Sequence, residues 1–215
     1  QFTNSRHIGG SLVANIRTVA FSGIEVLPIQ VQVAIAGGLP AFTIVGLPDK
    51  AVAESRERVR AALGAIGLAL PPKRITVNLA PADVQKEGSH FDLPIALGLL
   101  TAMDVLPKEE IDGYVALGEL GLDGGIAAVA GVLPAAMAAN GIDKGLICPG
   151  AQGGEAAWAG GAEVLAPDSL LALINHFKGA SPLLPPKPTT PQAGSAGPDL
   201  KDIKGQETAK RALEV

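Results

Sequence analysis

Three neighbouring residues, Ser89, His90 and Asp92, are of the types that carry out nucleophilic catalysis. A serine hydroxyl becomes a nucleophile when a nearby base, such as an imidazole, accepts its proton. Here the serine and the histidine are adjacent in the chain, and adjacent side chains rarely point at each other. Two interpretations stay open: a Ser89–His90 catalytic pair, or turn and cap residues in which Ser89 caps the apolar helix that follows.

Four carboxylates could suggest a metal site or a general acid–base pair: Asp49, Asp83, Glu87 and Asp92. They fall in separate predicted loops and a helix cap, and no His or Cys lies at the spacing of a zinc site. We therefore expect caps and solvated carboxylates, with no metal and no cofactor in this chain.

Seven cations could contact phosphates: Lys50, Arg56, Arg58, Arg60, Lys73, Arg74 and Lys86. Lysine and arginine neutralise backbone phosphates without reading bases, so these residues are the candidates for DNA binding. The alternative is a solvated helix face, because Glu54 and Arg58 have the i,i+4 spacing of a helical ion pair. The residues alone favour the solvated face.

Alternation and helical periodicity predict the elements that hold these residues. Strands are expected at 12–21, 29–35, 42–45, 74–79, 114–120, 125–129 and 145–148. A helix begins after Asp49, a suitable N-cap, and runs to about residue 63. Further helices are expected at 93–103, 133–139, 155–158 and 169–177. Asp123-Gly124 is typical of a hairpin turn, so we interpret the repeated glycines at 118, 121 and 124 as turn residues, not a phosphate-binding loop.

Composition indicates a globular protein with a sizeable core. Apolar residues make up 47% of the 215 residues, charged residues 18%, and the net charge is −4. A strongly basic nucleic-acid-binding domain is therefore not indicated. The one cysteine, Cys148, lies in an apolar stretch typical of a buried small hydrophobe, which fits a cytoplasmic protein. The most apolar run, 93–103, is far shorter than the roughly 20 residues of a membrane span.

The composition changes along the chain and predicts its organisation. Residues 1–10 look unlike the rest and are expected to be a tag or a disordered start. Residues 11–180 form the main domain, and the proline-rich residues 181–198 form a linker. Residues 199–215 look like the truncated start of another domain, too short to bury a core of their own.

Three stretches resemble the ComM/YifB family of magnesium chelatase-like AAA+ proteins. They are VGLPDKAV with ESRERVR in residues 45–60, KRITVNLAPAD, KEG and FDLPIA in residues 73–96, and DIKGQE with AKRAL in residues 202–213. The resemblance implies an α+β fold like ribosomal protein S5 domain 2 and the Lon protease domain, with a mixed sheet and helices packed on it. It implies that residues 199–215 begin an AAA+ ATPase whose phosphate-binding loop would come next. ATP and Mg²⁺ are expected for the full-length protein only.

The resemblance to Lon also raises the possibility of peptidase activity. Lon-type enzymes place a serine nucleophile in a K-D-G-P-S-A-G stretch, and the matching residues here put His90 at the nucleophile position, preceded by Ser89. The lysine that serves as base falls on Pro134, which has no amine. We expect Ser89, His90, Asp92 and Pro134 to mark a degenerate protease site without catalytic function.

The resemblance implies that the full-length protein is a hexameric DNA branch-migration motor in recombination during natural transformation. This chain would be its non-catalytic amino-terminal domain, contacting DNA or organising the ring. A DNA-processing context strengthens the case for the seven cations. Two alternatives remain: a protein-interaction or assembly module without DNA contact, and a Lon-like peptidase with a relocated nucleophile. The expected partners are DNA, the protein's own AAA+ domain and further copies of the chain, without a membrane.

Overall fold

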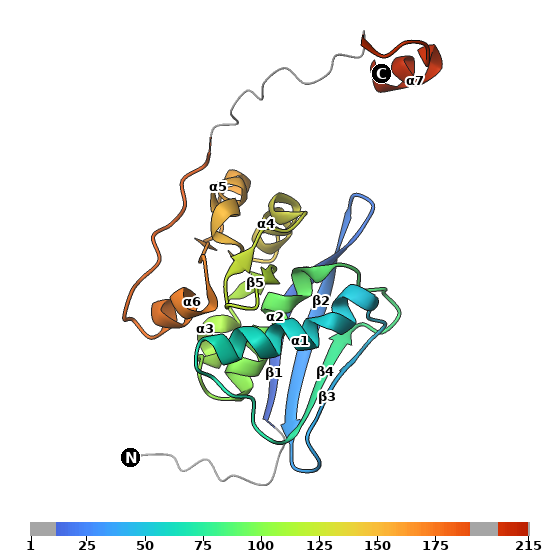
Figure 1. Ribbon diagram of the computed structural model, residues 1–215. Coiled ribbons are helices and arrows are strands. Elements are labelled where there is room, and N and C mark those ends of the chain that lie inside the picture. Colours follow the sequence, from blue (N-terminus) through green and yellow to red (C-terminus); the bar gives the residue numbers. More distant parts are fainter. Residues whose placement is uncertain (1–11, 190–201, 215) are drawn as a thin grey trace.

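The structure is a computed structural model that describes residues 12–189 and 202–214 (Figure 1). The predicted start at 1–10 and the second half of the predicted linker, 190–198, lie outside the described residues. Within the described ranges, no helix combines the length and the apolarity that a membrane span needs.

A seven-stranded mixed sheet forms the centre of the domain. Its strands lie in the order β3-β4-β2-β1-β5-β8-β9. Strand β2 pairs antiparallel with β1 and with β4, and the other neighbours pair parallel. The bounds are β1 Leu12–Ser22, β2 Glu25–Ala36, β3 Ala41–Val45, β4 Arg74–Ala80, β5 Tyr114–Ala116, β8 Gly145–Ile147 and β9 Val164–Leu165. The predicted mixed sheet with packed helices is confirmed.

The helices lie close to their predicted positions. They are α1 Lys50–Ala65, α2 Asp92–Ala102, α3 Lys108–Ile111, α4 Val132–Asn140, α5 Gly153–Ala156, α6 Leu170–Phe177 and α7 Glu207–Glu214, with 3-10 turns η1 Ser89–Phe91, η2 Gly150–Gln152 and η3 Ala157–Ala159. The single-turn α3 and the 3-10 turns η1 and η2 were not predicted, and α7 lies in the stretch that was expected to begin another domain. Asp49 caps α1 as expected, because its Oδ1 accepts a hydrogen bond from the Val52 N–H at 2.7 Å.

Two apolar cores lie on opposite faces of the sheet. Helices α1, α2 and α6 share one core with the inward-facing residues of β1–β4. Every residue of α2 is buried, so this helix is the centre of the domain. Helix α4 packs with β5 and β8 in the second core, around Val132 and Leu146. That second face carries polar side chains along β2 and β4, where Asn78 Nδ2 donates to Gln32 Oε1 at 2.8 Å.

The predicted strand 114–120 is wrong in its middle. Strand β5 ends at Ala116, and a separate pair, β6 Glu119–Leu120 and β7 Ile126–Ala127, forms the predicted hairpin. The break occurs because Gly118 bends toward α2: its N–H donates to His90 O and its carbonyl accepts from Leu93 N. A Cβ at Gly118 would lie 3.0 Å from Ile126 Cγ2 and 3.1 Å from Leu93 Cδ2, so a larger residue would require these two side chains to shift.

The first half of the predicted linker, residues 181–189, forms no helix or strand but lies against the domain. The Leu183 N–H donates to His176 Nδ1 at 3.0 Å, and the Trp158 indole N–H donates to the Thr189 carbonyl at 2.7 Å. A Cβ on Gly154 would lie 2.4 Å from the Thr189 methyl carbon, so this glycine allows the segment to approach. Residues 181–189 are therefore anchored to the domain at several points.

Candidate functional site

Ser89 and His90 lie in η1, directly before α2. The Ser89 hydroxyl donates a hydrogen bond to the Glu119 carboxylate. His90 is only 7% exposed, and its Nε2 lies 2.9 Å from the Val19 carbonyl oxygen. A carbonyl only accepts, so the neutral ring carries its proton on Nε2. The two side chains have separate partners, and no Ser89–His90 hydrogen bond is found within the described residues.

The predicted helix-cap role of Ser89 is wrong, although its place in a turn is confirmed. The N-cap of α2 is Phe91, which makes no side-chain cap. Ser89 lies too far before α2 to cap it, and its hydroxyl donates to the Glu119 carboxylate instead.

Burial lowers the pKa of His90, and the Val19 carbonyl together with the Asp92 and Asp49 charges partly offsets this effect. The buried imidazole is therefore held neutral.

A hollow of about 600 Å³ lies beside this turn. Its lining comprises Phe21, Asp49, Glu87, Gly88, Ser89, His90, Ala128, Val129 and Ala130. The Phe21 and His90 ring centroids are 5.6 Å apart, and a Cβ on Gly131 would lie 2.4 Å from Phe21. The start of α4 and the η1 turn therefore meet across Phe21. Pro134, in the first turn of α4, is exposed and brings no amine to this place.

The buried Asp92 and the partly buried Arg58 form an ion pair that joins three elements. The Arg58 Nε donates to Asp92 Oδ2 at 2.6 Å and its Nη2 donates to Oδ1 at 3.0 Å. The same Asp92 Oδ2 accepts from the Leu120 N–H at 3.2 Å, so α1, α2 and β6 meet at one carboxylate. Hydrogen bonding to Asp92 raises the pKa of Arg58. Asp92 is fully buried, so this pair holds the fold together and is not open to a substrate.

Lys86 is a second internal cation. Its side chain is fully buried, and its ammonium donates to the carbonyls of Pro81 and Val84. Burial lowers the pKa of Lys86. Its backbone bonds to Leu47 and Asp49, which fixes the loop after β4 against the loop before α1. Lys86 therefore braces two loops.

The other candidate cations divide into paired and unpaired groups. Lys50 lies 3.8 Å from a Glu54 carboxylate oxygen, and Arg56 Nε lies 3.0 Å from Glu57 Oε1. The unpaired group consists of Arg60, Lys73 and Arg74, which are exposed and form no ion pair within the described residues. Arg60 and Lys73 line one groove of about 500 Å³. Of the seven candidate cations, the structure thus brings only Arg60 and Lys73 to one groove.

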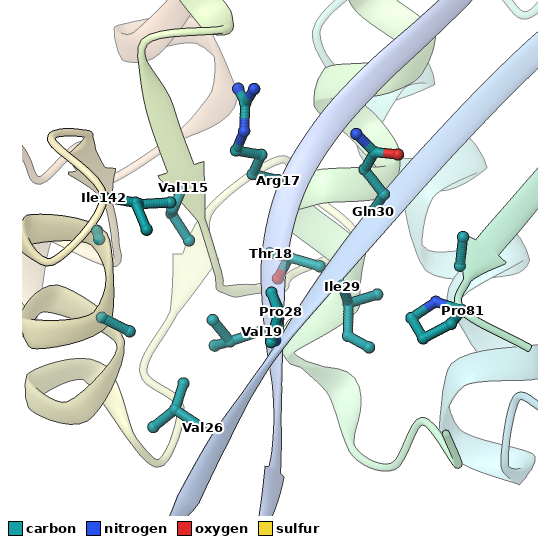
Figure 2. A pocket seen from close by; sticks show the side chains of 13 residues that line it. Arg17, Thr18, Val19, Val26, Pro28, Ile29, Gln30, Pro81, Val115 and Ile142 are labelled. Atoms are coloured by element: carbon teal, nitrogen blue, oxygen red, sulfur yellow. The ribbon is translucent and has the colours of Figure 1, made fainter. Parts of the chain in front are cut away.

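Another hollow, of about 530 Å³, lies where β1 and β2 meet the end of α4 (Figure 2). Figure 2 shows Val19, Val26 and Pro28 together in its apolar part, with Arg17 and Gln30 away from them. Arg17 donates to Asp112 at 2.6 Å, so its charge is already paired. This hollow offers apolar contact and no acid–base chemistry.

No group of three or more His, Cys, Asp or Glu side chains that could hold a metal ion occurs in residues 12–189 and 202–214.

The sequence profile described as subunit ChlI of Mg-chelatase matches residues 31–152, more than half of the chain. The chain belongs to the ChlI family of Mg-chelatase subunits. The match runs from β2 to η2 and so includes the Arg58–Asp92 pair, the η1 turn and all seven candidate cations.

Several known proteins match almost the whole chain. YifB of Escherichia coli (strain K12) is 40% identical over 200 residues, which is 93% of this chain and 40% of YifB. Competence protein ComM of Haemophilus influenzae is 37% identical over 208 residues, 94% of this chain and 41% of ComM. Rv2897c of Mycobacterium tuberculosis is 36% identical over 202 residues, which is 92% of this chain and 40% of Rv2897c. The chain therefore spans about two-fifths of the length of these relatives.

Sequence reasoning missed one residue of this region, Glu119, and one contact between residues that it had named. Glu119, the partner of Ser89, is 30 residues away in the chain and lies on a strand that was not predicted as separate. The pairing of Arg58 with Asp92 was also missed, because the i,i+4 spacing pointed to Glu54, whose carboxylate lies 3.9 Å from Arg58. The sequence offered one indication of this ion pair: Asp92 is a charged residue at the start of an otherwise apolar helix.

Proposed function

We propose that this chain is the non-catalytic amino-terminal domain of a cytoplasmic, hexameric AAA+ ATPase that migrates DNA branches in recombination during natural transformation. The relative named competence protein ComM supports this role, as does the fraction of each relative that the chain spans. ATP and Mg²⁺ would be bound by the remaining part of the full-length protein. The DIKGQE stretch at residues 202–207, whose last residue begins α7, supports an ATPase domain in the full-length protein.

The proposed fold is the one shared by ribosomal protein S5 domain 2 and the Lon protease domain. In Lon-type enzymes a lysine amine acts as the base for the serine nucleophile, so the two positions must lie close together. Here the corresponding residues are His90 in η1 and Pro134 in α4. The contacts of Phe21 with His90 and with the start of α4 support the same arrangement. A histidine held by Val19 and a proline without an amine support a site that has lost its chemistry.

Within the full-length protein we assign this domain a role in protein interaction and ring organisation. One observation carries this choice: the charges of α1 are mostly satisfied within the chain. Lys50 and Arg56 lie beside glutamates, and Arg58 is bound to Asp92. A DNA-binding helix needs unpaired cations directed toward phosphates, and α1 has only Arg60 of that kind.

The test is assembly of the full-length protein with and without residues 12–189, in the presence of ATP and Mg²⁺. We expect mass photometry to show hexamers for the intact protein and smaller species for the shortened one. Circular dichroism must show that the shortened protein is still folded. Hexamers of equal stability in both proteins would refute the ring-organising role.

A second candidate, direct DNA contact, is favoured by the exposed Arg60, Lys73 and Arg74. Binding there would be independent of sequence and would weaken as salt increases. The test is binding of labelled single-stranded and four-way-junction DNA to this chain at low and at physiological salt. A variant with Arg60, Lys73 and Arg74 changed to alanine should lose binding, whereas Arg56→Ala should keep it. Absence of binding at low salt would remove this candidate.

A further inference from the structure

Strand β3 forms one border of the main sheet, beyond β4 (Figure 1). The Ala41 N–H donates toward β4, to the Lys73 carbonyl at 3.4 Å. Peptide groups point alternately to the two sides of a strand, so those of Phe42 and Ile44 face away from β4. No strand pairs with this outer side within the described residues. These two residues therefore offer a donor and an acceptor each along a free edge.

This edge lacks the usual protection against strand addition. Native edge strands commonly carry lysine, proline or an inward-pointing charge that prevents pairing with another chain. Strand β3 reads AFTIV and has none of these residues. Leu39 before it and Leu47 after it are 81% and 56% exposed. The border of the sheet is thus apolar and open to a further strand.

A groove adjoins the beginning of this strand. Its volume is about 500 Å³, and it lies between β3, the second half of α1 and the loop that leads into β4. Apolar side chains of Phe42, Leu68, Leu70 and Ile75 contribute to its lining. Arg60 and Lys73 are its charged residues, and no carboxylate lines it. The groove therefore suits a ligand with both apolar and acidic groups.

We propose that an extended polypeptide segment with alternating acidic and apolar residues binds here by adding a strand to β3. Its backbone pairs with the free peptide groups of Phe42 and Ile44, and its side chains reach the groove and the two cations. Strand addition of this kind takes affinity from main-chain hydrogen bonds and specificity from side-chain pockets. A free peptide edge fits a polypeptide better than a nucleic acid, because bases need stacking platforms and the groove has no exposed aromatic ring among its lining residues. This inference rests on the proposed interaction role and identifies the surface and the partner chemistry.

The test uses the whole 215-residue chain and a fluorescein-labelled peptide of repeated Glu-Val pairs. We expect saturable binding at low salt by fluorescence anisotropy, weakened roughly tenfold when Arg60 and Lys73 are both changed to alanine. Arg56→Ala is the matched control, since Arg56 lies on the same helix beside Glu57 and does not line the groove. A peptide of the same sequence with an N-methyl group on every amide should not bind, because neither of its edges can pair with β3.

Hydrogen exchange followed by NMR locates the contact. The amide protons of Phe42 and Ile44 should exchange more slowly with the Glu-Val peptide present, while that of Thr43, which faces β4, should not change. The proposal is wrong if the N-methylated peptide binds equally well, or if slower exchange appears only elsewhere. It is also wrong if these amides are already protected because β3 pairs with β3 of a second copy, which light scattering would show as a doubled mass.

The outcomes separate this inference from the proposed function. If removing residues 12–189 leaves the ring intact but the peptide binds at β3, the ring-organising role fails and the surface stands. If the ring needs this domain but the peptide does not bind, the role stands and this surface fails. A labelled oligonucleotide that binds where the peptide does not would replace the polypeptide with nucleic acid.

Discussion

The Arg58 guanidinium forms two hydrogen bonds with the fully buried Asp92 carboxylate, at 2.6 and 3.0 Å. The two residues are 34 positions apart and connect the middle of α1 to the first turn of α2. Since α2 is buried along its whole length, this pair fixes the central helix relative to the helix that covers it. Arg58, a candidate for phosphate binding, thus stabilises the fold instead.

We predict that Arg58→Ala lowers the free energy of unfolding by about 3 kcal/mol, because it leaves the Asp92 charge buried without its cation. Urea denaturation at pH 7.5 measures the change. Arg56→Ala is the control, since its exposed pair with Glu57 contributes no more than about 1 kcal/mol. Equal losses in the two variants would contradict the role assigned to the buried pair.

Local patterns in the sequence predicted most of the elements. Strand β4 alternates apolar Ile75, Val77 and Leu79 with polar residues, and all three are buried. Asp49 predicted the start of α1, because an N-cap acts on backbone groups only a few residues away. Both features depend on neighbours in the chain, so they can be found without knowing the fold.

The contacts at the candidate site depend on residues that are distant in the chain. The bend at Gly118 exists because Leu93 and His90 lie beside it, and neither adjoins it in sequence. Lys86 was expected at the surface, as lysines usually are, yet the carbonyls of Pro81 and Val84 hold it in the interior. Neither feature produces a periodic pattern in the sequence. The sequence therefore could not show which of the seven candidate cations are internal and which are exposed.

His90 should make stability depend on pH in the weakly acidic range. Burial lowers its pKa below the ordinary value of 6.5, so the unfolded chain binds the proton more readily than the folded one. The contribution of the neutral His90 ring to the free energy of unfolding is complete above pH 6.5. It is lost as the pH falls from 6.5 toward the lower pKa of His90 in the folded chain. The slope from this group is at most about 1.4 kcal/mol per pH unit.

Urea denaturation between pH 7.5 and 5 measures this slope. We expect His90→Gln, which retains a donor for the Val19 carbonyl, to give a smaller slope than the unchanged chain. Ser89→Ala, next to it in η1, has no group that titrates in this range and should retain the original slope. An unaltered slope in His90→Gln would show that other groups cause the pH dependence.

Cys148 should be unreactive in the folded chain. Burial raises the pKa of its thiol to about 12, chiefly through desolvation, and the side chain is fully buried. The reactive thiolate is therefore about a thousandfold scarcer at pH 8 than for a thiol with the ordinary value of 9.0. Reaction with Ellman's reagent should be very slow until guanidinium unfolds the chain, and then complete within minutes. Rapid reaction without denaturant would mean that β8 opens readily.

Ser89 should support no peptidase chemistry. Its hydroxyl donates to Glu119, the His90 Nε2 faces Val19, and the position of the lysine base is Pro134. Glu119 is half-buried, and a carboxylate is in general a far weaker base than a lysine amine, so Glu119 is a poor substitute for the lysine of Lon-type enzymes. We therefore expect neither cleavage of fluorescein-labelled casein nor labelling by a fluorophosphonate probe.

Ser89→Ala is the control for that experiment, and a known serine peptidase shows that the probe is active. Labelling of the unchanged chain that disappears in Ser89→Ala would restore the relocated-nucleophile hypothesis. Changing Glu119 to Gln would then show whether the carboxylate acts as the base, because glutamine retains an acceptor for the hydroxyl but cannot take up its proton. Labelling that is insensitive to Ser89→Ala would instead point to another hydroxyl and leave the degenerate site without activity.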